Sequence, residues 1–192
     1  DVDTGLRTDL LTYEGRITFL PSPTTGSIAY QVTPDDQSQG GGGRVSFPRS
    51  PRGRAQAGTP EPALDGVLAV RDASGRTVEV LDEPATAFQW SPDGTRLAFL
   101  DPQDNGTSMW RFWSPSGTVD GPSYAPSPES DELMLQFFDQ LAPTTRWWAP
   151  DGSAFAFAGR IQGREGIWVV ATTGGVAPSH VHEGGLVAWS PR

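Results

Sequence analysis

A block of tryptophan followed by a tight turn recurs along this chain and constrains its fold more than any other feature. Clear copies span Phe88–Phe99 and Arg146–Phe157, a shortened copy spans Val187–Pro191, and a degenerate copy spans Ile17–Tyr30. The repeated positions are Trp90, Pro92, Asp93, Gly94, Trp148, Pro150, Asp151, Gly152, Trp189 and Pro191. Self-similarity at a fixed spacing predicts a repeat architecture.

The chemistry of each block predicts a β-hairpin. In Ser91–Gly94 the proline presets φ at the second position of a turn, and the glycine adopts a backbone twist that is costly for other residues. A strand ending at Trp90 enters this turn, and Thr95–Leu100 leaves it with alternating apolar residues. Further strands expected in the same units lie at residues 67–70, 77–81 and 167–170.

The spacing of the tryptophans identifies the kind of repeat. Trp148 and Trp189 are 41 residues apart, which matches the ~40–45-residue period of a four-stranded propeller blade. Trp90 and Trp148 are 58 residues apart, so this unit needs a loop-sized insertion. Glycine (23) and proline (18) together make up about a fifth of the 192 residues, well above the ~12% average. We therefore expect an all-β fold, a partial β-propeller of about three to four blades, each with four antiparallel strands.

The expected blades divide the chain as a single domain or part of one. Residues 1–14 end one blade, and 15–84 form the next, with a flexible insertion at 37–62. Residues 85–143 form another blade, with a loop at 115–131. Residues 144–184 form a third blade, and 185–192 begin a further one. Leu10–Tyr13 is expected as an outer strand and Leu133–Phe138 as a strand after the loop. A fragment of a larger propeller is favoured over a closed four-bladed ring, and open blade edges predict self-association.

Composition excludes several classes of function. The chain has no cysteine, which removes disulfides, thiolate metal sites and cysteine nucleophiles. Its net charge of −9 argues against binding to nucleic acid or anionic membranes. No apolar run reaches the ~20 residues of a membrane-spanning helix. A Gly-x-Ser-x-Gly elbow and a phosphate-binding loop are also missing, so we expect no catalytic residues, cofactor or metal in this chain.

Four residues are candidates for a binding surface. Trp110 and Trp113 lie beside the second insertion, where tryptophans can stack on carbohydrate, whereas the other tryptophans fall on strand positions that pack between blades. His180 and His182 would place both rings on one face of a strand; a surface pair is favoured, with a metal-binding pair as the alternative.

Two acidic segments have structural interpretations. The segment Asp101–Gly106 starts like a calcium loop, but its twelfth position is Phe112 rather than glutamate, so it is interpreted as a hairpin turn. The acidic group Glu129, Asp131 and Glu132 is interpreted as a solvated charge cluster rather than a pair of catalytic acids.

The repeat also carries a family resemblance. The Trp-Ser/Ala-Pro-Asp-Gly block, followed by the strand Ile167–Val170 and a glycine turn, resembles the WD40-like (PD40) repeat of TolB-type β-propellers. It is similar as well to the N-terminal propellers of dipeptidyl-peptidase-IV and prolyl-oligopeptidase relatives. The resemblance implies a non-catalytic scaffold that binds a protein or peptide, in the periplasm or outside the cell, with a cytoplasmic location left open. The alternative is a propeller that gates substrate access to a serine peptidase domain lying outside this chain.

Overall fold

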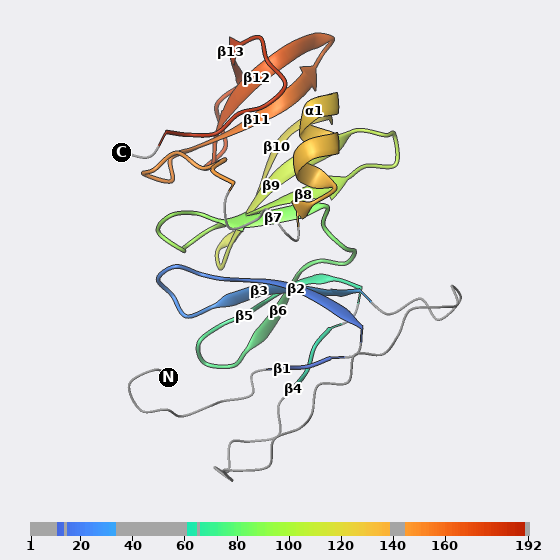
Figure 1. Ribbon diagram of the computed structural model, residues 1–192. Helices are drawn as coiled ribbons and strands as arrows, with labels where there is room; N and C mark the ends of the chain where they lie inside the picture. Colours follow the sequence, from blue (N-terminus) through green and yellow to red (C-terminus); the bar gives the residue numbers. More distant parts are fainter. Residues whose placement is uncertain (1–10, 14, 34–60, 65, 139–144, 191–192) are drawn as a thin grey trace, which may run out of the picture.

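The computed structural model describes residues 11–13, 15–33, 61–64, 66–138 and 145–190 (Figure 1). The fold class predicted from the sequence is confirmed: the described residues form mainly antiparallel sheets, in the arrangement of a partial β-propeller. Residues 37–60 of the predicted insertion at 37–62 lie outside the described residues. The same holds for residues 1–10 of the first predicted segment and for Pro191 of the last repeat.

The first sheet has four antiparallel strands in the order β2-β3-β5-β6. These strands are β2 (Arg16–Pro21), β3 (Ile28–Thr33), β5 (Leu68–Arg71) and β6 (Thr77–Leu81). The turn at Asp72–Gly75 connects the last two, with the Gly75 amide donating to the Asp72 carbonyl at 3.0 Å. Because alternating residues of β3 face opposite sides of the sheet, Ala29 joins the main core, while Tyr30 and Val32 form a small second cluster with Ala69.

A second, seven-stranded sheet contains the remaining repeats. Its order is β13-β12-β11-β10-β9-β8-β7, every neighbouring pair being antiparallel. The strands are β7 (Ala87–Trp90), β8 (Leu97–Pro102), β9 (Ser108–Ser114), β10 (Gly117–Pro126), β11 (Ala154–Ile161), β12 (Arg164–Ala171) and β13 (Ser179–His182). In Figure 1 the first sheet lies below the strands β7 to β10, and β11 to β13 lie above them.

Two repeats share this second sheet because one strand joins them. β10 pairs with β9 along most of its length, and its last two residues, Ala125 and Pro126, pair with Arg160 and Gly159 of β11. Gly159 has no room for a side chain, since a Cβ there would lie 2.4 Å from the Ala125 carbonyl oxygen. A glycine at this crossing therefore allows the two repeats to approach closely enough to hydrogen-bond.

The predicted loop at 115–131 is wrong: most of it is the strand β10. Gly121 and Pro122 suggest a loop in the sequence, but they fall where the pairing register shifts between Asp120 and Ser123. A bulge accommodates a proline that cannot donate a ladder hydrogen bond. Gly121 also lies against the Trp110 carbonyl oxygen, 2.6 Å from where its Cβ would be, so this backbone approach requires glycine.

The predicted strand at Leu133–Phe138 is also wrong, because a short helix begins just before it. The helix α1 (Pro128–Ser130) continues into a π-helical turn over Asp131–Leu135. Ser127 caps its first turn by accepting a hydrogen bond from the Ser130 amide at 3.1 Å, and Pro128 occupies a first-turn position. Leu135 and Phe138 are buried on the core side.

The terminal segments differ from their predicted strands. The two-residue strand β1 (Leu11–Thr12) pairs in parallel with β4 (Glu61–Pro62) and is not the outer strand of a four-stranded sheet. Residues 186–190 form no strand, although the Trp189 amide donates to the Arg146 carbonyl at 2.8 Å. One backbone hydrogen bond among the described residues of this segment does not make a ladder, which needs repeated pairs.

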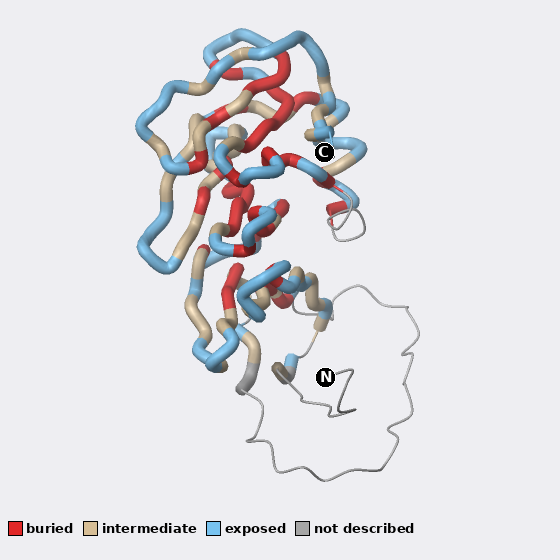
Figure 2. Tube along the Cα trace, turned by 90° about the vertical axis from the view of Figure 1, so that its left-hand side faces the viewer, coloured by how far each residue is buried: buried red, intermediate tan, exposed pale blue. Residues whose placement is uncertain are grey.

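A continuous core runs through both sheets. Most buried residues lie along the strands, and most exposed residues lie in the hairpin turns (Figure 2). The centre of this core is aromatic: Trp110 packs against Trp147 and Phe155 at centroid distances of 5.1 and 4.7 Å. Phe155 also contacts Phe112 and Trp148 edge to face. Large aromatic side chains thus fill the space between neighbouring repeats.

Candidate functional site

The segments that begin successive repeats are joined by the repeated tryptophans. The indole N–H of Trp90 donates to the Leu20 carbonyl at 2.9 Å, and that of Trp148 donates to the Gln89 carbonyl at 3.2 Å. The third member of the series is Trp189, whose indole N–H donates to the Trp147 carbonyl at 2.8 Å. In each case the acceptor precedes the tryptophan position of the preceding repeat. The three tryptophans therefore occupy equivalent places in neighbouring repeats.

The hairpin turns that follow these strands share one geometry. The Ser91 amide donates to the Arg96 carbonyl, and Gly94 to the Ser91 carbonyl, both at 2.8 Å. In the next repeat the Ala149 amide donates to the Ala154 carbonyl at 2.9 Å, and Gly152 to Ala149 at 2.8 Å. In the degenerate repeat the Ser22 amide donates to the Ser27 carbonyl at 2.8 Å.

An aspartate side chain closes each of the two clear turns. Asp93 accepts from the Thr95 amide at 3.1 Å and from the Ser91 hydroxyl at 2.5 Å. Asp151 likewise accepts from the Ser153 amide at 3.0 Å. The Ser91 hydroxyl stabilises the ionised carboxyl and lowers the pKa of Asp93 below its ordinary value. These aspartates therefore hold turns together.

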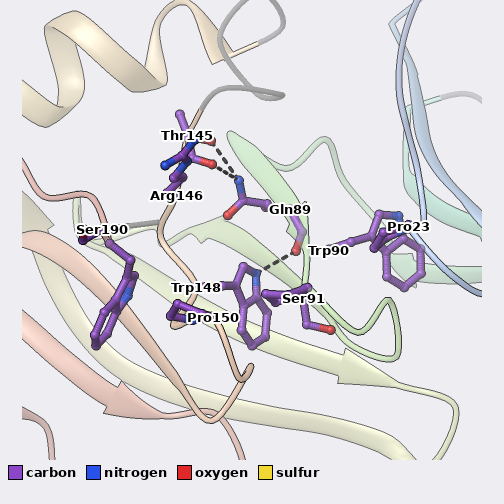
Figure 3. A pocket seen from close by; sticks show the side chains of 11 residues that line it. Pro23, Gln89, Trp90, Ser91, Thr145, Arg146, Trp148, Pro150 and Ser190 are labelled. Atoms are coloured by element: carbon purple, nitrogen blue, oxygen red, sulfur yellow. Dashed lines mark hydrogen bonds between the residues drawn. The ribbon is translucent and has the colours of Figure 1, made fainter. Parts of the chain in front are cut away.

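The segments that begin the repeats, together with their turns, line an open pocket of about 320 Å³, called here the inner-strand pocket (Figure 3). Its apolar lining comes from prolines and tryptophans of successive repeats: Pro23, Trp90, Pro92, Trp148, Pro150 and Trp189. Its polar lining consists of Gln89, Ser91, Thr145, Arg146 and Ser190. In Figure 3, Pro23 and Trp90 lie together at one end and Ser190 lies at the other. The volume falls within the range of small-ligand pockets.

Gln89 gives this pocket an unused acceptor. Its amide nitrogen donates to the Thr145 carbonyl at 2.7 Å and to the Thr145 hydroxyl at 2.9 Å, which fixes the orientation of the amide. Its oxygen, Oε1, is buried and accepts no hydrogen bond. Figure 3 shows this oxygen directed away from Thr145, toward the space beside Trp148 and Arg146. A buried acceptor without a donor is costly, so a ligand N–H or O–H at this point would gain free energy.

Sequence reasoning missed Gln89, Thr145 and Arg146. A signal existed, because Gln89 and Trp147 directly precede motif tryptophans and alternate residues of a strand face opposite sides. The partner Thr145 lies 56 positions away, and only the fold brings the two side chains together.

Trp110 and Trp113 are the tryptophans predicted to form a binding surface. Trp110 is buried, with 1% of its surface exposed, so the prediction is wrong for this residue. It lies at the centre of the aromatic core because β9 is an interior strand of the seven-stranded sheet. Its indole N–H makes no hydrogen bond of good geometry, although it lies near enough to the Tyr124 hydroxyl to favour its ionised form. Burial outweighs this effect and raises the pKa of Tyr124. Trp113 is half-buried and lines a different groove, between the two sheets.

The two histidines lie on the outer strand β13 but use their rings differently. The His180 ring packs edge to face on Trp168 at 5.1 Å, and its Nε2 lies 3.1 Å from the Glu165 carbonyl oxygen. The His182 ring is exposed, with Nδ1 2.5 Å from the Glu183 carbonyl oxygen. Across the described parts of the chain, no cluster of three or more His, Asp or Glu side chains is placed to hold a metal ion.

The acidic segments also have structural roles. The segment Asp101–Gly106 ends β8 and forms the predicted hairpin turn to β9, with the Gly106 amide donating to the Gln103 carbonyl at 3.0 Å. Asp101 is buried and accepts from Arg111 at 3.1 Å, and Arg111 also contacts Asp120 at 2.7 Å. Glu129, Asp131 and Glu132 lie at the start of the helix, where the positive end of the helix dipole stabilises negatively charged carboxylates.

Comparison with known proteins adds a weak likeness of fold. No family model and no curated protein matches the sequence. Among solved structures, the chain is similar to TolB from Acinetobacter baumannii, with 16% identity and a TM-score of 0.37. The match covers 56% of this chain and 24% of the TolB chain. Within the described residues, no helix is long and apolar enough to cross a bilayer.

Proposed function

We propose that this chain is a non-catalytic scaffold that binds an extended segment of a partner protein in the inner-strand pocket. The observation that carries the proposal is the buried, unpartnered oxygen of Gln89 at a pocket lined by proline and tryptophan side chains. An extended peptide supplies backbone N–H donors at regular spacing, and aromatic-lined grooves accept such segments without a large entropic cost.

The lining also favours a particular kind of segment. Trp148, Pro150 and Trp189 offer an apolar wall for an aliphatic or proline side chain of the partner. Arg146 is exposed at the pocket, where its guanidinium can pair with a carboxylate of the partner. We therefore expect a segment with an apolar residue next to an acidic one.

The charge and chemistry of the lining support binding rather than catalysis. Among the residues that line the inner-strand pocket, Arg146 is the one titratable side chain. General acid–base chemistry uses carboxyl, imidazole or similar groups within reach of the substrate, and this lining supplies none of them. The role of a peptidase-gating propeller and a periplasmic or extracellular location stay predictions, since the described residues do not bear on them.

A pair of glutamines provides the test. Gln89 and Gln31 both have a buried Oε1 without a partner, but Gln31 lies on β3 and does not line the pocket. Peptides selected from a random phage-displayed library on the full chain would be synthesised, and their Kd measured by fluorescence polarisation. Gln89→Leu should weaken binding by about tenfold, because it removes the acceptor for one hydrogen bond. Gln31→Leu should leave the Kd unchanged.

The outcomes separate the proposal from its alternatives. Weaker binding in Arg146→Ala for acidic peptides, together with the Gln89 result, would support the pocket assignment. Equal Kd values for Gln89→Leu and the native chain would overturn the proposal. It would also be overturned if no selected peptide bound the native chain in a way that free native protein could compete.

A further inference from the structure

A second groove lies between the first sheet and the strands β7 to β10, and it is separate from the inner-strand pocket in most of its lining. It has a volume of about 470 Å³ and runs from β5 and β6 of the first sheet to the end of β9 in the second. We call it the inter-sheet groove. This volume lies in the range of pockets that hold small ligands.

The floor of the groove is apolar and partly aromatic. Val70 and Val78 contribute from the first sheet, and Trp90 and Trp113 contribute from the second. The two indoles meet edge to face, 6.5 Å between centroids at 72°. Trp90 is nearly buried at 8% exposure, so Trp113 is the half-buried ring that a ligand can reach.

Trp113 differs from Trp90, Trp148, Trp168 and Trp189 in the state of its indole N–H, and it differs from the unpaired Trp110 in being partly exposed. The indole N–H groups of Trp90, Trp148, Trp168 and Trp189 all donate to backbone carbonyl oxygens. In the described part of the chain, no residue accepts a hydrogen bond from the indole N–H of Trp113. A tryptophan that is apolar on its face and unpaired at its polar tip is typical of ligand-binding surfaces.

Charged groups of both signs border this floor. Asp72 and Arg76 come from the turn between β5 and β6 and line the same groove. The Asp72 oxygen Oδ1 holds the turn, accepting from the Ser74 and Arg76 amides at 2.9 and 3.0 Å. The Arg76 guanidinium donates to no described acceptor and is exposed. One carboxylate and one guanidinium give the lining no net charge, which fits a neutral ligand rich in hydroxyl groups.

From these features we propose that the inter-sheet groove binds a neutral saccharide. A sugar ring has an apolar face that stacks on the Trp113 indole, and its hydroxyl groups both donate and accept. Asp72 can accept from hydroxyl groups, while Arg76 and the Trp113 N–H can donate to them. This inference concerns a different site from the peptide-binding pocket and does not depend on it.

The test uses the seven tryptophans as reporters. In a ¹⁵N-labelled full chain, the indole N–H cross-peak of Trp113 is identified by its loss in Trp113→Phe. Maltose, cellobiose and diacetylchitobiose are then titrated, with sorbitol as an open-chain polyol that has no ring face. At least one disaccharide should shift the Trp113 cross-peak saturably with a Kd of ~1 mM or below. The cross-peaks of Trp148 and Trp168, which lie outside the groove, should move little.

Variants separate stacking from charge. Trp113→Ala should weaken binding by about tenfold in calorimetry, and Trp113→Phe should retain part of it because a ring remains. Arg76→Gln should weaken binding several-fold, whereas Arg164→Gln, an exposed arginine on β12, should not. Unchanged unfolding curves for both arginine variants would show that folding is not the cause.

Three results would overturn the proposal. The first is that no disaccharide shifts the Trp113 cross-peak at ~10 mM. The second is that Trp113→Ala binds as tightly as the native chain. The third is that decaproline, and no saccharide, shifts the cross-peak, which would assign the groove to a peptide. None of these results changes the Gln89 experiment, so the two proposals fail independently.

Discussion

The indole N–H of Trp148 donates to the backbone carbonyl of Gln89, which lies 59 positions earlier in the chain. Trp90 makes the same contact with Leu20, and Trp189 makes it with Trp147. Each of these three tryptophans is therefore anchored to the segment that begins the preceding repeat. This relationship links the stability of the fold to the shape of the inner-strand pocket, since Gln89 and Trp148 both line it.

Replacing Trp148 should test the strength of this anchor. Trp148→Ala should lower the free energy of unfolding by ~3–5 kcal/mol, because a buried ring is lost from a packed core. Trp148→Phe keeps a ring but removes the N–H donor, and should cost about 1–3 kcal/mol. Urea unfolding followed by circular dichroism measures both. Val176→Ala, at a residue 67% exposed, is the control and should change stability by less than ~0.5 kcal/mol. A similar small change for Trp148→Ala would contradict the packing described above.

Two glycines with nearly the same backbone conformation separate strain from contact. Gly94 and Gly106 both have positive φ, 69° and 76°. A Cβ at Gly94 would lie 2.3 Å from the Ser22 hydroxyl oxygen, whereas one at Gly106 would meet nothing within 4 Å. Gly106→Ala should cost about 1–2 kcal/mol for the backbone conformation alone. Gly94→Ala should cost clearly more, because the contact between the first and second repeats must also shift. Equal costs in urea unfolding would mean that the Ser22 contact is unimportant.

Acid sensitivity should depend on the Ser91 hydroxyl. Its hydrogen bond lowers the pKa of Asp93 in the folded chain, so the stabilisation is present above the unfolded value of 3.8. It should be lost as the pH falls through the lower, folded pKa. Ser91→Ala should raise the Asp93 carboxyl midpoint toward its ordinary value in an NMR titration and flatten the acid limb of the stability curve. An unchanged midpoint in this variant would show that another group lowers the pKa.

Arg96 should couple two repeats. Its guanidinium donates to the Gly152 carbonyl at 3.0 Å, contacts the Thr172 hydroxyl, and lies 5.8 Å from the centroid of the Trp148 ring. Arg96→Met should cost about 1–3 kcal/mol, and Arg96→Lys should not restore it, because lysine lacks the planar fork. A double-mutant cycle with Thr172→Val measures the coupling. A coupling energy near zero would indicate that the two groups act independently.

Local chemistry explains what could be predicted from the sequence. The hairpins around Gly94 and Gly152 follow from turn residues and period-two alternation, which act over a few positions. The helix at Pro128 was missed, although Ser127, Pro128 and Glu129 form a recognisable helix start. The apolar run at 133–138 predicts a strand when it is taken without the cap that precedes it.

Other features depend on distant parts of the chain. The position of Trp110 beside a segment rich in serine and proline suggests a surface residue, yet β10 covers one edge of its strand and Phe155 packs on its ring. The contact of Gln89 with Thr145 has no counterpart in any local pattern. Such features arise from how strands are arranged, which spacing alone does not determine.

The direction of the tryptophan contacts has a consequence for any attempt to rearrange this protein. Each of these three tryptophans donates to a carbonyl in the unit before its own, whereas the degenerate first repeat has no tryptophan and supplies only an acceptor. A transplanted unit would therefore meet a foreign backbone on one side and offer its own carbonyl to a foreign indole on the other. Every junction between Leu20 and Trp189 separates at least one of these indoles from its acceptor, so a chimera should fold only where the foreign unit places a carbonyl at the same point.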